Sequence, residues 1–111
     1  MKQLKLSKRC NHNKLINFGF KKSGMSYKMS VPLYKRNGET MISADFLVSC
    51  LDNYIGFDVM DVCNKTLYST FYDTTFQNRS DVLLIVKKSL ESVLEEMASE
   101  NIIQKRGLKF E

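Results

Sequence analysis

The 111-residue sequence has little of what enzymes and metalloproteins use. It contains one histidine (His12), one proline (Pro32), no tryptophan and three scattered cysteines, Cys10, Cys50 and Cys63. Because the cysteines are odd in number and lack CxxC spacing, we expect neither a disulfide framework nor a zinc site. No GxSxG, glycine-rich phosphate loop or HExxH motif accompanies the histidine. We therefore expect a protein that is not an enzyme and that uses no cofactor and no metal.

Long apolar runs are also missing. The longest run, Val82 to Val86, is far shorter than the roughly 20 residues that a helix needs to cross a bilayer, and no signal-peptide segment follows Met1. We therefore expect a cytoplasmic protein with reduced cysteines. Its partner should be neither a membrane nor a small-molecule substrate.

Negative charge is absent from the start of the chain. Ten of the 17 Lys and Arg residues precede Glu39, which is the first of the 12 Asp and Glu residues, although the net charge is only +5. Clustered cations neutralise phosphates and release condensed counterions, so this asymmetry favours a polyanionic partner.

The composition nevertheless predicts a folded protein. Hydrophobic residues make up 43% and aromatic residues 11% of the chain, which is enough for one core at this length. We divide the chain into a basic arm at 1–10, a single α+β domain at 11–104 and a basic tail at 105–111. The arm is either a short edge strand or mobile.

The first half predicts a short helix followed by a hairpin. Asn11 or Asn13 can cap a helix that ends at Gly19. Alternating apolar residues then predict a strand at 27–34, in which Pro32 requires an edge, a bulge or a strand end. Asn37 and Gly38 favour a type I′ turn into a return strand at about 40–51, where the uneven pattern indicates burial on both faces or a bulge near 44–45.

The second half predicts two more strands and a long helix. The strands cover 55–60 and 66–72, the latter because it is rich in aromatic and β-branched residues. A box formed by Asn78 and Asp81 begins a helix that ends between Ser99 and Gln104. We therefore predict an α+β fold with a short N-terminal helix, a four-stranded antiparallel meander, and a long C-terminal helix packed on one face as a second layer.

The basic first third is the leading candidate site. Lysines supply phosphate neutralisation, and an exposed aromatic side chain can stack on a base. The alternative is that Phe18, Phe20 and Tyr27 are core residues and the lysines only solubilise the surface. We expect a small non-enzymatic protein that binds nucleic acid or a nucleoprotein through a Lys-rich N-terminal surface formed by Lys5, Lys8, Arg9, Lys14, Lys21, Lys22, Lys28, Tyr34, Lys35 and Arg36.

A second hypothesis uses the acidic side of the long helix. Glu91 and Glu95 would contact a basic groove on a protein partner. A small Lys-rich domain also suits a bacterial phage or mobile element, where it would inhibit a defence nuclease such as a CRISPR effector by protein contact or by blocking a nucleic-acid or guide-RNA channel. The oligomeric state stays open.

The segment from Asn13 to Tyr27 resembles the opening of small Firmicute domains of the MmcQ/YjbR type. It has the order of a short helix, Gly-Phe-Lys-Lys and a strand, and the similarity extends through Asp58 to Asp61 and Val82 to Ile103. That family is described as DNA-binding. The resemblance implies a binding module without catalysis over residues 11–103.

Overall fold

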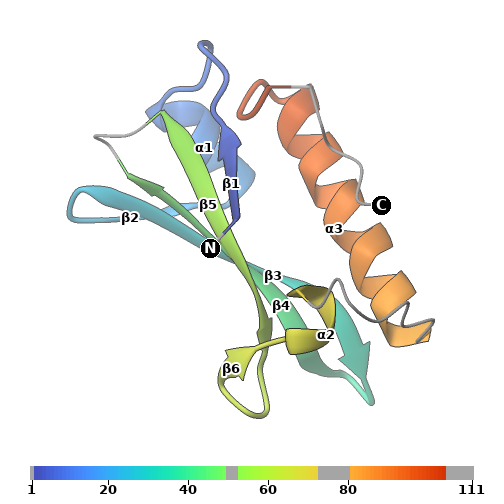
Figure 1. Cartoon of the computed structure of the whole chain (residues 1–111). Coiled ribbons are helices and arrows are strands. Elements are labelled where there is room, and N and C mark those ends of the chain that lie inside the picture. Colours follow the sequence, from blue (N-terminus) through green and yellow to red (C-terminus); the bar gives the residue numbers. More distant parts are fainter. Residues whose placement is uncertain (1, 50–52, 73–80, 105–111) are drawn as a thin grey trace.

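The computed structural model describes residues 2–49, 53–72 and 81–104. Helices and strands follow the chain as β1 (Lys2–Lys5), α1 (His12–Phe18), β2 (Lys21–Ser23), β3 (Ser26–Arg36), β4 (Glu39–Ser49), β5 (Tyr54–Asp61), β6 (Thr66–Leu67), α2 (Ser69–Tyr72) and α3 (Asp81–Ser99). The strands form one antiparallel sheet in the order β1-β5-β4-β3-β2, and β6 pairs with β5. The α+β class with a long C-terminal helix is therefore confirmed (Figure 1).

The predicted four-stranded meander is wrong, because short strands extend both edges of the sheet. β1 pairs with β5. Leu4 of β1 packs against the core, while the other side chains of β1 are exposed. β2 turns into β3 through Gly24, whose φ of 60° suits glycine. Strands of three or four residues carry too little alternation to be read from sequence.

The predicted strand at 66–72 is also wrong. Only Thr66 and Leu67 pair with β5, and Ser69–Tyr72 forms the helical turn α2. The Tyr72 hydroxyl accepts a hydrogen bond of 2.8 Å from the backbone N–H of Val59, and Phe71 is buried in the core. Tertiary packing therefore overrides the β propensity of this segment.

The β3–β4 hairpin turns at Asn37 and Gly38, whose φ values of 54° and 83° confirm the predicted turn. The register between β3 and β4 shifts at Pro32, as expected for a residue that has no N–H to donate. A second shift follows between Tyr34 and Lys35, so the irregularities fall at residues 32–35 of β3 and 40–43 of β4 rather than near residues 44–45. In β4, Ile42, Ser43 and Ala44 are buried in succession, which confirms burial on both faces.

The helix α1 begins at the predicted cap, Asn11, whose side chain accepts a hydrogen bond from the N–H of Lys14. It ends at Gly19, where φ is 130° and an added Cβ would lie 3.3 Å from the Met29 sulfur. The predicted cap of α3 at Asn78 lies outside the described residues. The end of α3 at Ser99 is confirmed, and the chain leaves it through Asn101, which has a φ of 59°.

One core fills the space between the sheet and the helices. From the sheet it takes the side chains that alternate on one face of β3, β4 and β5, among them Phe46 and Phe57, whose ring centroids lie 5.6 Å apart. From α3 it takes one stripe, formed by Leu83, Val86, Leu90, Leu94, Met97 and Ala98. The core thus lies between one face of the antiparallel sheet and the long C-terminal helix.

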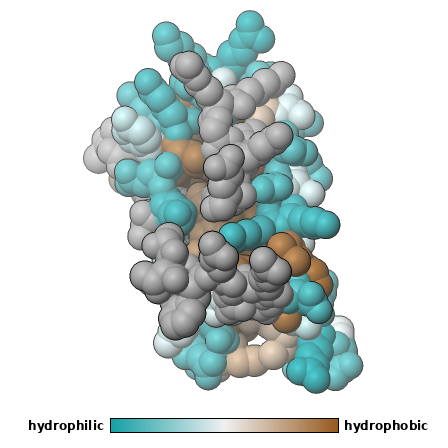
Figure 2. All heavy atoms as spheres, turned by 45° about the vertical axis from the view of Figure 1, so that its right-hand side comes forward, coloured by the Kyte–Doolittle hydropathy of each residue, from teal (hydrophilic) through white to brown (hydrophobic). Residues whose placement is uncertain are grey.

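Figure 2 shows the side of the molecule that carries α3. Hydrophilic residues cover much of it, and hydrophobic residues gather toward the lower right of the view. Exposed apolar side chains on α3 include Leu84 and Ile85. No helix of the described residues is long and apolar enough to span a membrane.

The position of the core makes a direct prediction about stability. Leu94 is completely buried, whereas Leu84 on the same helix is 52% exposed. We expect Leu94→Ala to lower the free energy of unfolding by about 2–5 kcal/mol, because it removes buried apolar atoms and leaves a cavity. Leu84→Ala should change it by about 0.5 kcal/mol or less. Urea unfolding followed by circular dichroism measures both, and equal effects would contradict the assigned core.

Candidate functional site

The predicted basic residues are divided between the two ends of the sheet. Lys35 and Arg36 lie at the tip of the β3–β4 hairpin, and Lys28 lies near the other end of β3. Seven residues separate Lys28 from Lys35, which is about 23 Å along a strand. The structure therefore does not join the ten predicted residues into a single surface.

At the Lys28 end, lysines lie on the sheet face that points away from the helices. Lys21 of β2 is directly opposite Lys28 of β3, and both are exposed. Like charges in directly opposed positions destabilise a sheet. The fold thus holds an unfavourable pair of charges on an open surface, which an anion would relieve.

The same sheet face carries an exposed aromatic residue. Tyr54 begins β5, is 48% exposed and alternates with the buried Ile55 and Phe57, so it lies on the outer face. Its partner in β1 is Lys5. Lys28 is in register with Gly56 of β5 and Gln3 of β1, so Tyr54 and Lys5 lie two residues further along their strands. With three strand spacings between β3 and β1, Lys28 and Lys5 are about 16 Å apart, and Tyr54 lies on the intervening strand β5. We name Lys5, Lys21, Lys28 and Tyr54 the basic platform.

Beyond the basic platform, the outer face becomes acidic. Asp45 and Asp58 are paired across β4 and β5, and Asp45 accepts hydrogen bonds from Ser30 at 2.7 Å and from Ser43 at 3.2 Å. A polyanion on this face would therefore be attracted to the end with the lysines and repelled from the middle.

A cavity of about 560 Å³ adjoins the basic platform at the ends of the strands. Its lining includes Lys5 and Lys8, and it also holds His12, whose Nδ1 lies 2.7 Å from the hydroxyl of Tyr27. The contact between His12 and Tyr27 cannot be read from the sequence, because the two residues are 15 positions apart.

The remaining predicted residues face elsewhere. Lys8 and Arg9 lie in the loop after β1, and Lys22 is paired with the core residue Tyr27. Tyr34 is half-buried against the core rather than free to stack. Among the aromatics considered for stacking, Phe20 and Tyr27 are buried, which supports their alternative role as core residues.

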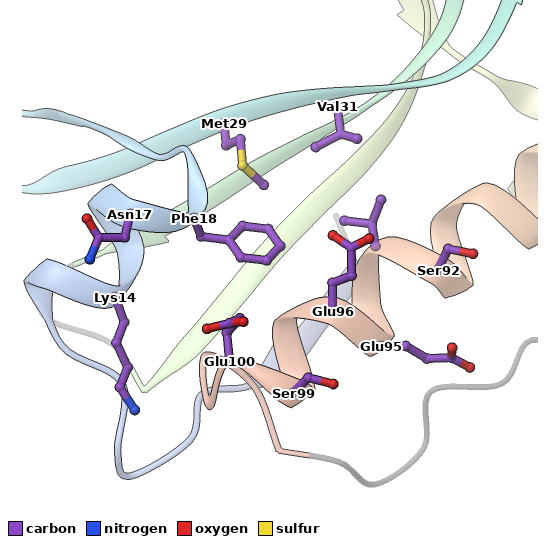
Figure 3. A pocket seen from close by; sticks show the side chains of 11 residues that line it. Lys14, Asn17, Phe18, Met29, Val31, Ser92, Glu95, Glu96, Ser99 and Glu100 are labelled. Atoms are coloured by element: carbon purple, nitrogen blue, oxygen red, sulfur yellow. The ribbon is translucent and has the colours of Figure 1, made fainter.

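A second and larger cavity, of about 900 Å³, lies on the other side of the sheet between α1 and α3 (Figure 3). We call it the acidic groove. Its lining comprises Lys14, Asn17, Phe18, Met29, Val31, Ser92, Val93, Glu95, Glu96, Ser99 and Glu100. Figure 3 shows Glu96 of α3, and Glu100 just after the end of α3, on the side of the groove that faces Phe18, while Lys14 extends away from the ring of Phe18.

Of the two predicted protein-binding residues, Glu95 lines the acidic groove and Glu91 does not. Glu96 and Glu100 carry the negative charge into the groove instead. They are four residues apart, so their like charges oppose each other along the helix by about 0.2–0.5 kcal/mol. The four-residue spacing between Glu96 and Glu100 can be read from the sequence. The position of these two carboxylates near Phe18 of α1 cannot, because it depends on how α1 and α3 pack on the sheet.

The C-terminal end of α3 further disfavours the negative charges of Glu96 and Glu100. The last turn of α3 contains no basic residue, although the negative end of a helix dipole favours cations by about 0.3–1 kcal/mol each. The acidic groove therefore collects negative charge at the position where the helix itself stabilises it least.

Reactive groups in the described part of the chain are few. Cys10 is half-buried, and desolvation raises the pKa of its thiol, while the nearby Lys14 acts to lower it. Desolvation also raises the pKa of Tyr72, opposed by its hydrogen bond from Val59. Within residues 2–49, 53–72 and 81–104, no three His, Cys, Asp or Glu side chains gather closely enough to hold a metal ion.

Comparisons with known proteins identify a solved structure with a similar fold. No protein-family model matches the chain, and no curated protein matches it either. The fold is similar to a crystal structure, at 1.20 Å resolution, of a DUF1831 family protein from Lactobacillus plantarum. The TM-score is 0.68 with 14% sequence identity, over 89% of this chain and 82% of that one.

The resemblance to the MmcQ/YjbR type is therefore wrong. No family model supports it, and the similar solved structure reported above is described as a DUF1831 family protein. The segment on which it rested, Asn13 to Tyr27, is a capped short helix followed by a hairpin. Local physics of capping and turns produces such a segment, so it does not identify a family.

Alkylation of Cys10 tests the surroundings described for the cavity. Because burial raises its pKa, less thiolate is present at a given pH, and we expect Cys10 to react with iodoacetamide more slowly than a model cysteine peptide at pH 8. Its rate should continue to rise above pH 9. Lys14→Gln should slow the reaction further, whereas Lys87→Gln should not. Peptide mapping by mass spectrometry measures the rates, and a faster Lys14→Gln variant would contradict this assignment.

Proposed function

We propose that this protein is a non-enzymatic binding protein that engages single-stranded nucleic acid, free or within a nucleoprotein, on the basic platform. The observation that carries the proposal is the directly opposed pair Lys21 and Lys28 on the outer face of the sheet. A polyanion turns their repulsion into two favourable contacts and releases counterions.

Single strands suit this surface better than duplexes. A sheet face offers bases a flat support, and an exposed aromatic ring between cations stacks a base in a sequence-tolerant way. Tyr54 supplies the ring, and Lys5 and Lys28 flank it. No recognition helix is needed for such binding, and α3 packs on the opposite side of the sheet.

The inhibitor hypothesis is compatible with the same surface. A small domain that occupies a nucleic-acid channel would need a basic surface of this kind. No contact or distance in the fold favours a defence nuclease over other partners, so that hypothesis stays a prediction.

The salt dependence of binding tests the role of the lysines. Fluorescence anisotropy with labelled 20-nucleotide DNA and RNA strands should show binding at low salt. The double variant Lys21→Gln/Lys28→Gln should reduce the log-log salt slope by about 1.4 and weaken binding about twentyfold at 0.1 M salt. The control Lys35→Gln/Arg36→Gln removes the same charge at the far end of β3 and should have a much smaller effect. Absent binding, a slope near zero or equal losses in both doubles would overturn the proposal.

Stacking on Tyr54 is tested separately from charge. Tyr54→Ala should weaken binding by about 1–3 kcal/mol, or about five- to 150-fold, because it removes a stacked ring. Tyr54→Phe keeps the ring and should bind within about twofold of the unmodified protein. Since the side chain is exposed, both variants should unfold at nearly the same temperature. Equal binding by the Ala and Phe variants would remove Tyr54 from the site.

A further inference from the structure

The acidic groove lies on the other side of the sheet from the basic platform and has features of a binding site for a different ligand. Phe18, Met29, Val31 and Val93 form its apolar lining and are only partly buried. A ligand that covers them removes apolar surface from water. The apolar side of such a ligand must fit between α1, α3 and the sheet.

The charge around this apolar lining is mostly negative. Glu95 and Glu96 come from α3 and Glu100 directly follows it, and among the described lining residues the only cation, Lys14, extends away from Phe18 (Figure 3). The carboxylates lie near the C-terminal end of α3, whose dipole adds negative potential. Nucleic acids and acidic peptides are therefore repelled, and cationic ligands are attracted.

The shape of the groove favours an elongated ligand. Its α3 wall runs from Ser92 to Ser99, which is about 10 Å, or two helical turns. Ligand cavities for small molecules enclose most of the ligand surface, whereas this one is open along a side between α1 and α3 (Figure 3). Helix-in-groove recognition uses such a geometry, with apolar anchors at helical spacing.

We propose that the acidic groove binds a basic amphipathic helix of another protein. Its apolar side chains lie on Phe18, Met29 and Val31, and its Lys or Arg heads reach Glu96 and Glu100 while their aliphatic stems cover apolar surface. A bound cation relieves the repulsion between Glu96 and Glu100. This inference does not depend on nucleic-acid binding, because it uses the other side of the sheet.

The test uses the full chain and a labelled 14-residue peptide of Lys and Leu at helical spacing. Anisotropy should show binding that weakens with salt, and a matched peptide of Glu and Leu should not bind. Glu96→Gln/Glu100→Gln should weaken binding of the Lys/Leu peptide at least tenfold. The control Glu39→Gln/Glu91→Gln changes the net charge equally outside the groove and should stay within twofold.

Two further measurements separate the alternatives. Val31→Ser should weaken peptide binding at least threefold when binding is measured well below the unfolding temperature of the variant, because Val31 is only partly buried. The unfolding temperature is measured in parallel, because Val31 also packs against the core. Equal losses in the two Glu doubles, or no loss in Val31→Ser, would overturn the proposal. Sedimentation of the protein alone tests whether a second copy of the chain occupies the groove. A dimer that Glu96→Gln/Glu100→Gln abolishes would also overturn the proposal. Binding of single-stranded nucleic acid by Glu96→Gln/Glu100→Gln is measured in parallel. The result distinguishes failure of this proposal from failure of the proposed nucleic-acid binding on the basic platform.

Discussion

The packing of α3 against one face of the sheet is the interaction on which the rest of the structure depends. Leu90 and Leu94 of the helix and Phe46 and Phe57 of the sheet are all buried in the same core. Because α3 adds its apolar side chains to this one face, exposed residues such as Lys28 and Tyr54 lie on the other face. The asymmetry creates two environments: a flat face that carries the basic platform, and a helix-covered side with a groove where α1 and α3 separate.

Both candidate surfaces hold charges that the fold alone does not favour. Lys21 and Lys28 oppose each other across two strands, and Glu96 and Glu100 repel each other at the end of a helix whose dipole also disfavours them. Small electrostatic costs of this kind are tolerated when the core supplies ample stability, and they prepare a surface for a ligand of opposite charge. The unequal distribution of charge along the sequence thus becomes two surfaces of opposite sign on opposite sides of one sheet.

The long elements were predictable from sequence and the short ones were not. The stripe on α3 and the Asn37-Gly38 turn gave strong local signals, whereas β1 and β2 are held by pairing with distant or adjacent strands. The segment at 66–72 was misjudged because the burial of Phe71 outweighs local propensity. For the candidate site, the sequence indicated which residues are charged, but only the register placed Lys21 opposite Lys28 and separated both from the hairpin tip.

The two ends of the described chain are joined to each other through the backbone. Ser7 donates to Ile102 at 2.9 Å, Gln104 donates to Lys5 at 3.1 Å, and Leu6 forms a bridge with Ile103. These contacts connect segments almost a hundred positions apart, and β1 itself pairs with a strand some fifty positions away. Such separations slow folding, since the entropy of closing a long loop is lost before the contacts form. On a ribosome, β1 has to wait for β5, and closure of the fold has to wait until α3 has been made.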